Sequence, residues 1–232
     1  MIGDPIFWLF VLPGLLLGAY AQSKIKLNIA KYSQIPISGG LTGAEVARRI
    51  LDAAGLQAIA IEATPGMLSD HYDPRTKRLR LSQNVYFAPT VAAAGVAAHE
   101  AGHALQDAED YFPLEARTYI VPLVQLSSQI APWLFIFGLM ANSANLTWIG
   151  VILFGASSLF SLITLPVEFN ASSRALNQLV SHGIISDAEQ IKGVKSVLSA
   201  AAWTYVAAAM SAIGSWLFYI VLMLGSRGRR TT

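Results

Sequence analysis

Three long stretches of the chain contain no charged residue and no histidine. They run over residues 5–23, 118–167 and 196–226. A helix needs about 20 apolar residues to cross a membrane, so the middle stretch is long enough for two crossings and each of the others for one. The composition agrees, because only 13% of the residues are charged, against about 25% in soluble domains. The sequence therefore predicts a multi-pass membrane protein.

The four predicted spans belong to one membrane-embedded domain over residues 1–232, and we place them near residues 5–22, 119–141, 147–167 and 203–224. A polar turn, Asn142–Asn145, joins the two middle spans. The first span is followed, not preceded, by basic residues, which favours an uncleaved anchor over a signal peptide. Because the middle hairpin crosses twice, the loop 23–118 and a predicted helix at 168–202 lie on the same side of the membrane.

The positive-inside rule places that side in the cytoplasm. The basic residues near its membrane ends are Lys24, Lys26, Lys31, Arg117 and Arg174. A second basic cluster follows the last span and opposes this orientation, unless the fourth segment does not fully cross the membrane: Arg227, Arg229 and Arg230. We expect the larger group to decide, so that the chain is a cell-membrane protein whose loop 23–118 faces the cytoplasm.

Residues 99–103 read His-Glu-Ala-Gly-His, which is the pattern HExxH. Positions i and i+4 share one face of a helix, so His99 and His103 can bind one Zn²⁺, and Glu100 can act as general base on a water molecule there. The surrounding run 90–106 is rich in Ala and contains two glycines. It predicts a helix with little side-chain bulk, against which other backbone packs closely.

A catalytic zinc needs a third protein ligand. Glu168 is a candidate because it is the first charge after the uncharged stretch, at a depth where a carboxylate is costly unless it is paired or metal-bound. The alternatives are an interfacial carboxylate that extends towards water, or a partner of Arg174. The rival ligands lie shortly before the metal helix and are His71, Asp70 and Asp73, the last of which a turn also explains. His182 precedes a glycine and is explained by the end of a helix.

The loop region predicts a small α+β part. Thr42 and Glu45 form a capping box, and the helix that follows ends at Gly55. Residues 68–73 and 78–82 predict a β-hairpin. Its second strand, Leu79-Arg80-Leu81, is a candidate to bind an extended substrate by strand addition, although its arginines also suit a solvated face.

Several motifs resemble those of the YugP-type membrane zinc metallopeptidases, in order along nearly the whole chain. They are residues 70–74, 79–82, 99–104, 164–169 and 204–208. More loosely, the chain resembles membrane metalloproteases of the HtpX and CAAX-protease kind. The resemblance implies a zincin-like catalytic part in which Zn²⁺ is held by His99, His103 and Glu168, with Glu100 as base.

Four more residues are candidates for contacts with the metal ligands or with the transition state. Asn170 and Ser172 stand where related proteins carry Asp, and a neutral side chain there can still hydrogen-bond an imidazole N–H. Tyr205 and His71 are candidates to stabilise the oxyanion.

The sequence thus predicts a mainly α protein of the lipid bilayer that is a zinc-dependent endopeptidase, acting on a peptide or membrane-protein substrate. The alternative is a non-catalytic zinc-binding scaffold or chaperone, which four protein ligands around the metal would favour. A transporter is disfavoured, because the spans hold no ionisable residue except Glu168 and no inverted repeat. The net charge of +2 does not indicate nucleic acid, and no pattern indicates a particular oligomer.

Overall fold

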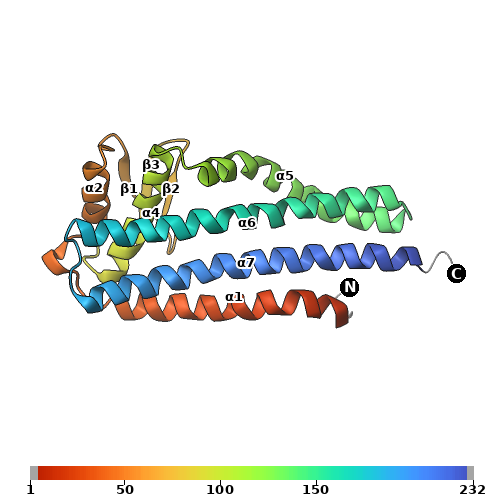
Figure 1. The fold of residues 1–232 in the computed structure, drawn as a ribbon, viewed down its shortest axis with the longest axis horizontal. Helices are drawn as coiled ribbons and strands as arrows, with labels where there is room; N and C mark the ends of the chain where they lie inside the picture. Colours follow the sequence, from red (N-terminus) through yellow and green to blue (C-terminus); the bar gives the residue numbers. More distant parts are fainter. Residues whose placement is uncertain (1–4, 229–232) are drawn as a thin grey trace. The chain divides into compact units, whose positions relative to one another are not determined.

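Most of the chain is helical. The computed structural model describes residues 5–228, with side chains as far as residue 225, of the 232 in the sequence. The order of elements is α1 (Pro5–Tyr32), a 3-10 helix (Ser38–Gly40), α2 (Gly43–Ala53), β1 (Ala60–Thr64), β2 (His71–Asp73), β3 (Arg78–Ser82), α3 (Gln83–Tyr86), α4 (Val91–Ala108), α5 (Phe112–Met140), α6 (Ala144–Ser181) and α7 (Ala188–Gly228) (Figure 1). This confirms the mainly α protein with a small α+β part.

Among the described helices, α1, α5, α6 and α7 are long and apolar enough to cross a membrane. Three of them continue well beyond the predicted spans. The 38 residues of α6 extend for about 57 Å, whereas the hydrocarbon core is about 30 Å thick. A helix can leave the membrane in this way because its backbone hydrogen bonds are made internally. The polar turn between α5 and α6 is confirmed, and Asn142 in it has a φ of 53°.

The segment 168–202, predicted as one helix, is divided. Its first part ends α6 and its last part begins α7, with a break at residues 182–187. Gly183 has a φ of 63°, and the N–H of Ile184 donates to the carbonyl of Leu179 at 2.9 Å. This left-handed cap ends the helix where His182 and Gly183 predicted an end.

The chain forms two compact units, the first made of residues 1–20, 115–165 and 203–232 and the second of residues 21–114 and 166–202. The assignment of residues 1–232 to one membrane-embedded domain stays a prediction. The basic cluster Arg227, Arg229 and Arg230 lies outside the residues whose side chains are described.

The first unit is suited to lipid. Its helices approach closely at small residues, because a Cβ at Gly14 would lie 2.7 Å from the backbone nitrogen of Ser211. Large apolar side chains are exposed on its helices, among them Leu9, Trp133 and Ile152. Such a surface is stable against hydrocarbon and not against water.

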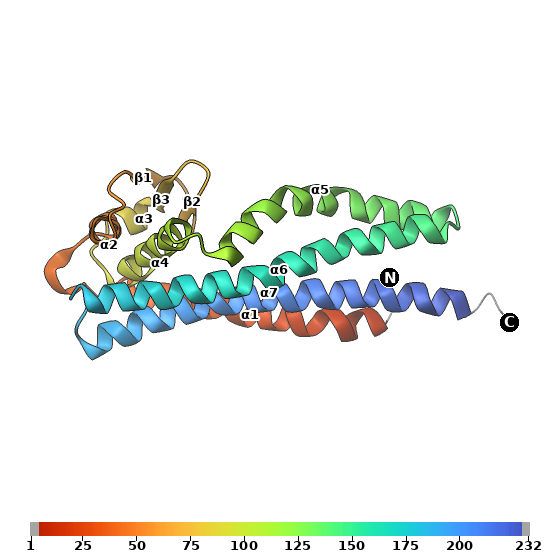
Figure 2. The same ribbon diagram turned by 45° about the horizontal axis from the view of Figure 1, so that its top comes forward.

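The second unit contains a three-stranded sheet in the order β1-β3-β2. The predicted hairpin is confirmed as β2 and β3, which are antiparallel, and β1 adds to the other side of β3 in parallel. Figure 1 shows α2 and α4 beside these strands, and Figure 2 shows α3 there as well. Fully buried residues fill the core between the elements, including Ile50, Leu51, Leu79, Leu81 and Leu179. The capping box of Thr42 and Glu45 is also confirmed.

Candidate metal centre

The helix α4 carries the HExxH residues. It begins at Thr90, whose hydroxyl accepts a hydrogen bond from the N–H of Ala93 at 3.3 Å. His99 and His103 follow one turn apart, and their rings meet edge to face with centroids separated by 4.7 Å. The predicted helix at 90–106 is therefore confirmed, and it presents both imidazoles on one face.

Glu168 of α6 reaches the same point. Its Oε2 lies 3.2 Å from Nε2 of His99 and 3.7 Å from Nε2 of His103, and its side chain is 2% exposed. Within residues 5–228, these three side chains form the group of potential metal ligands, with ligand atoms within 4.8 Å of one another. Of the candidate third ligands, the structure thus brings Glu168 to the histidine pair, whereas His71, Asp70 and Asp73 do not join this ligand group.

The donor set and its spacing fit Zn²⁺. Two imidazole nitrogens and a carboxylate oxygen are typical ligands of catalytic zinc, and ligand atoms in a tetrahedral site lie about 3.3 Å apart. Burial alone would lower the pKa of His103, but its hydrogen bond with Glu168 and the charges of Glu100 and Glu168 raise the pKa overall. The two carboxylates therefore favour a cation at this point, and a divalent metal supplies one.

A polar side chain contacts the outer nitrogen of each histidine. Nδ1 of His99 lies 3.2 Å from Oγ of Ser172, and Nδ1 of His103 lies 2.9 Å from Oε1 of Gln106, to which it can donate. Such contacts fix the ring orientation and leave Nε2 for the metal. Ser172 lies beside a ligand, as expected. Sequence reasoning missed Gln106, whose signal was its position three residues after His103 on the same helix.

Gln106 connects this centre to α6 and to the surface. It is fully buried, and its Nε2 donates to Oδ1 of Asn170 at 2.9 Å. The same oxygen accepts from Nε of Arg174, which binds both carboxylate oxygens of Glu109 at 2.7 Å. The guanidinium lowers the pKa of Glu109. Asn170 therefore acts on a metal ligand through Gln106, and does not itself contact an imidazole.

Glu100 lies beside the ligands but is outside the ligand group. Its Oε2 accepts a hydrogen bond from the backbone N–H of Tyr72 at 3.0 Å, and the residue is 8% exposed. The hydroxyl of Tyr72 donates to Asp107 at 2.6 Å, and Lys77 also pairs with Asp107. Burial and then the Asp107 carboxylate raise the pKa of Tyr72. These contacts attach β2 and the turn after it to α4, at Glu100 within the HExxH residues and at Asp107 beyond them.

Two candidate residues lie elsewhere. His71 is exposed on β2, where Nδ1 lies 2.8 Å from the carbonyl of Ser69 and Nε2 lies 3.4 Å from a nitrogen of Arg80. It does not join the ligand group. Tyr205 belongs to α7 in the first unit, and its role stays a prediction.

The expected substrate strand, Leu79-Arg80-Leu81, requires a correction. It lies in β3, which is the central strand of the sheet. Leu79 and Arg80 pair with β1 on one side and with β2 on the other. A central strand has no free edge, so strand addition there is wrong. Sequence reasoning failed because it did not foresee β1, which joins β3 from outside the hairpin.

The approach of α4 to α6 depends on a glycine. A Cβ at Gly102 would lie 2.7 Å from the carbonyl oxygen of Ala171. Ala171 lies between Glu168 and Ser172 in α6, so the missing side chain brings both of these residues within reach of His99. This confirms the expected close packing of backbone on the metal helix.

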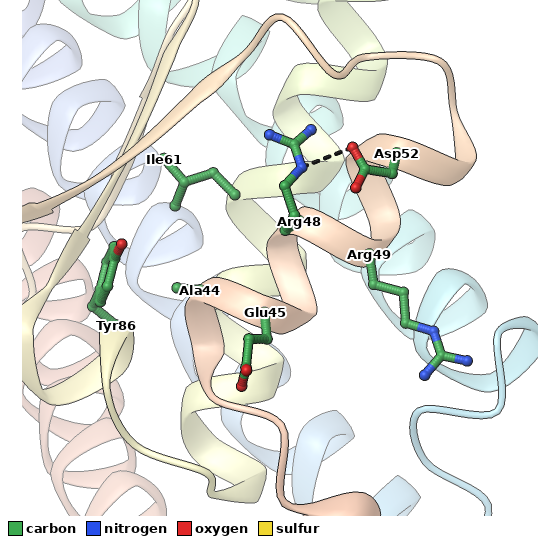
Figure 3. A pocket seen from close by; sticks show the side chains of 7 residues that line it. All are labelled: Ala44, Glu45, Arg48, Arg49, Asp52, Ile61 and Tyr86. Atoms are coloured by element: carbon green, nitrogen blue, oxygen red, sulfur yellow. Dashed lines mark ion pairs between the residues drawn. The ribbon is translucent and has the colours of Figure 1, made fainter.

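A separate hollow of about 590 Å³ lies beside α2 (Figure 3), lined by Ala44, Glu45, Arg48, Arg49, Asp52, Ile61 and Tyr86. Arg48 pairs with Asp52 at 2.8 Å and donates to the carbonyls of Leu56 and Ile59. Its charge therefore holds the loop that follows α2. The hollow has no histidine in its lining and is not the metal centre.

Comparisons with known proteins agree with this centre. A family described as "Putative neutral zinc metallopeptidase" matches residues 7–224, and the chain belongs to this family. The chain is 48% identical to the "Putative membrane protease YugP" of Bacillus subtilis (strain 168), over 96% of this chain and 98% of that protein. No solved structure gives a significant match. Together with the four apolar helices, these matches identify a multi-pass membrane protein of this family.

Proposed function

We propose that this chain is an integral-membrane zinc endopeptidase. The observation that carries the proposal is the convergence of His99, His103 and Glu168, with Glu100 beside them, in one buried centre. The described residues supply three protein ligands. Three ligands leave one position of a tetrahedral zinc for water, whereas structural zinc sites have four. The centre therefore favours an enzyme over a scaffold.

The chain's own residues can carry the proton transfers. Zinc bound by the three ligands would supply Lewis-acid chemistry, lowering the pKa of water towards about 7 and polarising the scissile carbonyl. Glu100 then takes the proton from the attacking water and returns it to the leaving amine. The N–H of Tyr72 holds one of its oxygens, and we assign the other oxygen to proton transfer.

We assign substrate binding to the edge of β2. Among the described strands, β2 pairs with β3 alone, so no strand covers its other edge and an extended peptide can add there beside the N–H that Glu100 accepts from. The N–H of Tyr72 donates to Glu100 and not to β3, which supports this edge facing the catalytic carboxylate. A peptide there would pass the metal ligands. We also propose that the centre faces the cytoplasm, because basic residues predominate at the membrane ends on that side.

The test is Glu100→Gln, which keeps the shape of the side chain and removes the base. We expect zinc content and thermal unfolding to match the wild type, and hydrolysis of a peptide library to fall by about 10²–10⁴-fold. Glu189→Gln is the matched control, since Glu189 is exposed at the start of α7. Unchanged hydrolysis in Glu100→Gln would remove the catalytic assignment, and no hydrolysis by the zinc-loaded wild type would favour the scaffold.

A further inference from the structure

A cavity of about 420 Å³ lies along α4, before the metal ligands in the sequence. Its volume is within the range of about 300–1,000 Å³ that is usual for ligand pockets. All of its lining belongs to the second unit and comes from α1, the loop before β2, the residues after β3, and α4. Most of the lining is aliphatic and includes Ile25, Ile29, Met67, Leu68, Val85 and Val96.

The carboxylate in the lining is already engaged within the protein. The carboxylate of Asp70 accepts hydrogen bonds from the N–H of Ser82 at 2.7 Å and from its hydroxyl at 3.0 Å. Lys26 is exposed and can keep its charge in water. The cavity therefore offers apolar contact to a ligand, and not an ion pair.

The cavity lies next to the catalytic centre. Val96 and Ala92 line it, and they precede His99 by three and seven residues, which places them on the same face of α4. At 1.5 Å per residue, Val96 is only about 4.5 Å from His99 along the helix axis. Asp70 lines the cavity two residues before Tyr72, whose N–H holds Glu100. A peptide on the β2 edge would therefore pass the cavity.

The rim of the cavity holds two large apolar side chains in exposed positions. Met67 is 80% exposed and Leu68 is 62% exposed. Leu68 has a φ of 56°, which is uncommon for leucine and persists only where the surrounding structure holds it. The hydroxyl of Ser69 holds the loop by donating to the carbonyl of Pro65 at 3.1 Å. A loop fixed in this way presents apolar surface to a ligand.

We propose that this cavity receives a bulky apolar side chain of the peptide substrate, so that the enzyme selects apolar segments. The proposal rests on the proposed function and adds the substrate class. Burial of a Leu or Phe side chain is strong enough to favour it over Ser or Asp by roughly 10- to 100-fold in affinity.

The test measures peptide binding apart from catalysis. The full chain with Glu100→Gln, loaded with zinc in detergent, is titrated with fluorescent peptides that differ at one position, where they carry Leu, Phe, Ser or Asp. Ala30→Phe then fills the cavity from an exposed position on α1. Ala53→Phe is the matched control, an equal change at an exposed position of α2 outside the cavity lining. Zinc content shows that each variant is folded.

We expect the Leu and Phe peptides to bind roughly 10- to 100-fold more tightly, and this preference to be lost in Ala30→Phe and kept in Ala53→Phe. Equal affinity for all four peptides, or a preference that survives Ala30→Phe, would overturn the proposal. So would a change in bound phospholipid in Ala30→Phe without a change in peptide preference. If the preference behaves as expected but the wild type hydrolyses none of the peptides, the apolar site stands and the peptidase assignment falls.

Discussion

Replacing Gly102 by alanine tests how the metal centre is assembled, because helix propensity and packing predict opposite results. Alanine in the middle of a helix is favoured over glycine by about 0.5–1 kcal/mol. The added Cβ, however, would lie 2.7 Å from the carbonyl oxygen of Ala171, whereas ordinary contacts begin at 3.4 Å. Backbone at this position cannot rotate away, and overpacking costs about 1–3 kcal/mol. We therefore expect a net loss of stability of about 0–2 kcal/mol.

The larger expected effect of Gly102→Ala is on zinc. To restore an ordinary contact, α6 must move by about 0.7 Å, the difference between 3.4 and 2.7 Å. This exceeds the tolerance of about 0.2 Å in metal–ligand distances, and both Glu168 and Ser172 would move. We expect zinc affinity, measured by competition with a chelator, to fall by about 10–100-fold.

The matched control for this change is Gly95→Ala on the same helix. A Cβ there would lie 3.6 Å from the nearest atom of Val194, which is an ordinary contact. We expect unchanged zinc affinity and a melting temperature equal to the wild type or about 2–4 °C higher. If Gly102→Ala bound zinc as tightly as Gly95→Ala, the close contact between α4 and α6 would not position the ligands.

Two further changes test other parts of the structure. Gln106→Leu should lower zinc affinity by about 10–100-fold, because it leaves Nδ1 of His103 and Oδ1 of Asn170 without their amide partner. The control is Gln57→Leu, a change at an exposed position that should leave zinc affinity unchanged. Equal zinc affinities in the two variants would show that Gln106 does not support His103 as a ligand. To test the membrane orientation, Ala58→Cys is suitable because Ala58 is exposed and the chain has no cysteine. The cysteine should resist an impermeant thiol reagent in intact cells and react with it after lysis. A reporter fused after Thr232 should lie outside the cytoplasm. Labelling of the cysteine without lysis would place the metal centre on the outer face of the membrane.

Local patterns predicted much of the fold and the centre. The spans follow from uncharged stretches, and the metal helix follows from the spacing of His99 and His103, because both depend on residues close in sequence. Glu168 could be singled out because a carboxylate at the end of an uncharged stretch needs a partner. These features are set by the cost of burying charge and by helix periodicity.

Features that depend on distant segments were not predicted. The parallel pairing of β1 with β3 joins segments separated by the whole of β2, and no local pattern records it. That pairing made β3 central and moved the free edge to β2. The spacing of Gln106 from His103 is a local signal, but its bond to Asn170 forms only after α4 and α6 pack together.

The central claim is that His99, His103 and Glu168 together hold one zinc ion, and metal analysis of purified variants tests it most directly. We expect one zinc per chain in the wild type and in His71→Ala, because His71 is exposed and lies outside the ligand group. Glu168→Ala should lose zinc at a chelator concentration that the wild type withstands. Zinc retained at the wild-type level in Glu168→Ala, together with its loss from His71→Ala, would contradict the account.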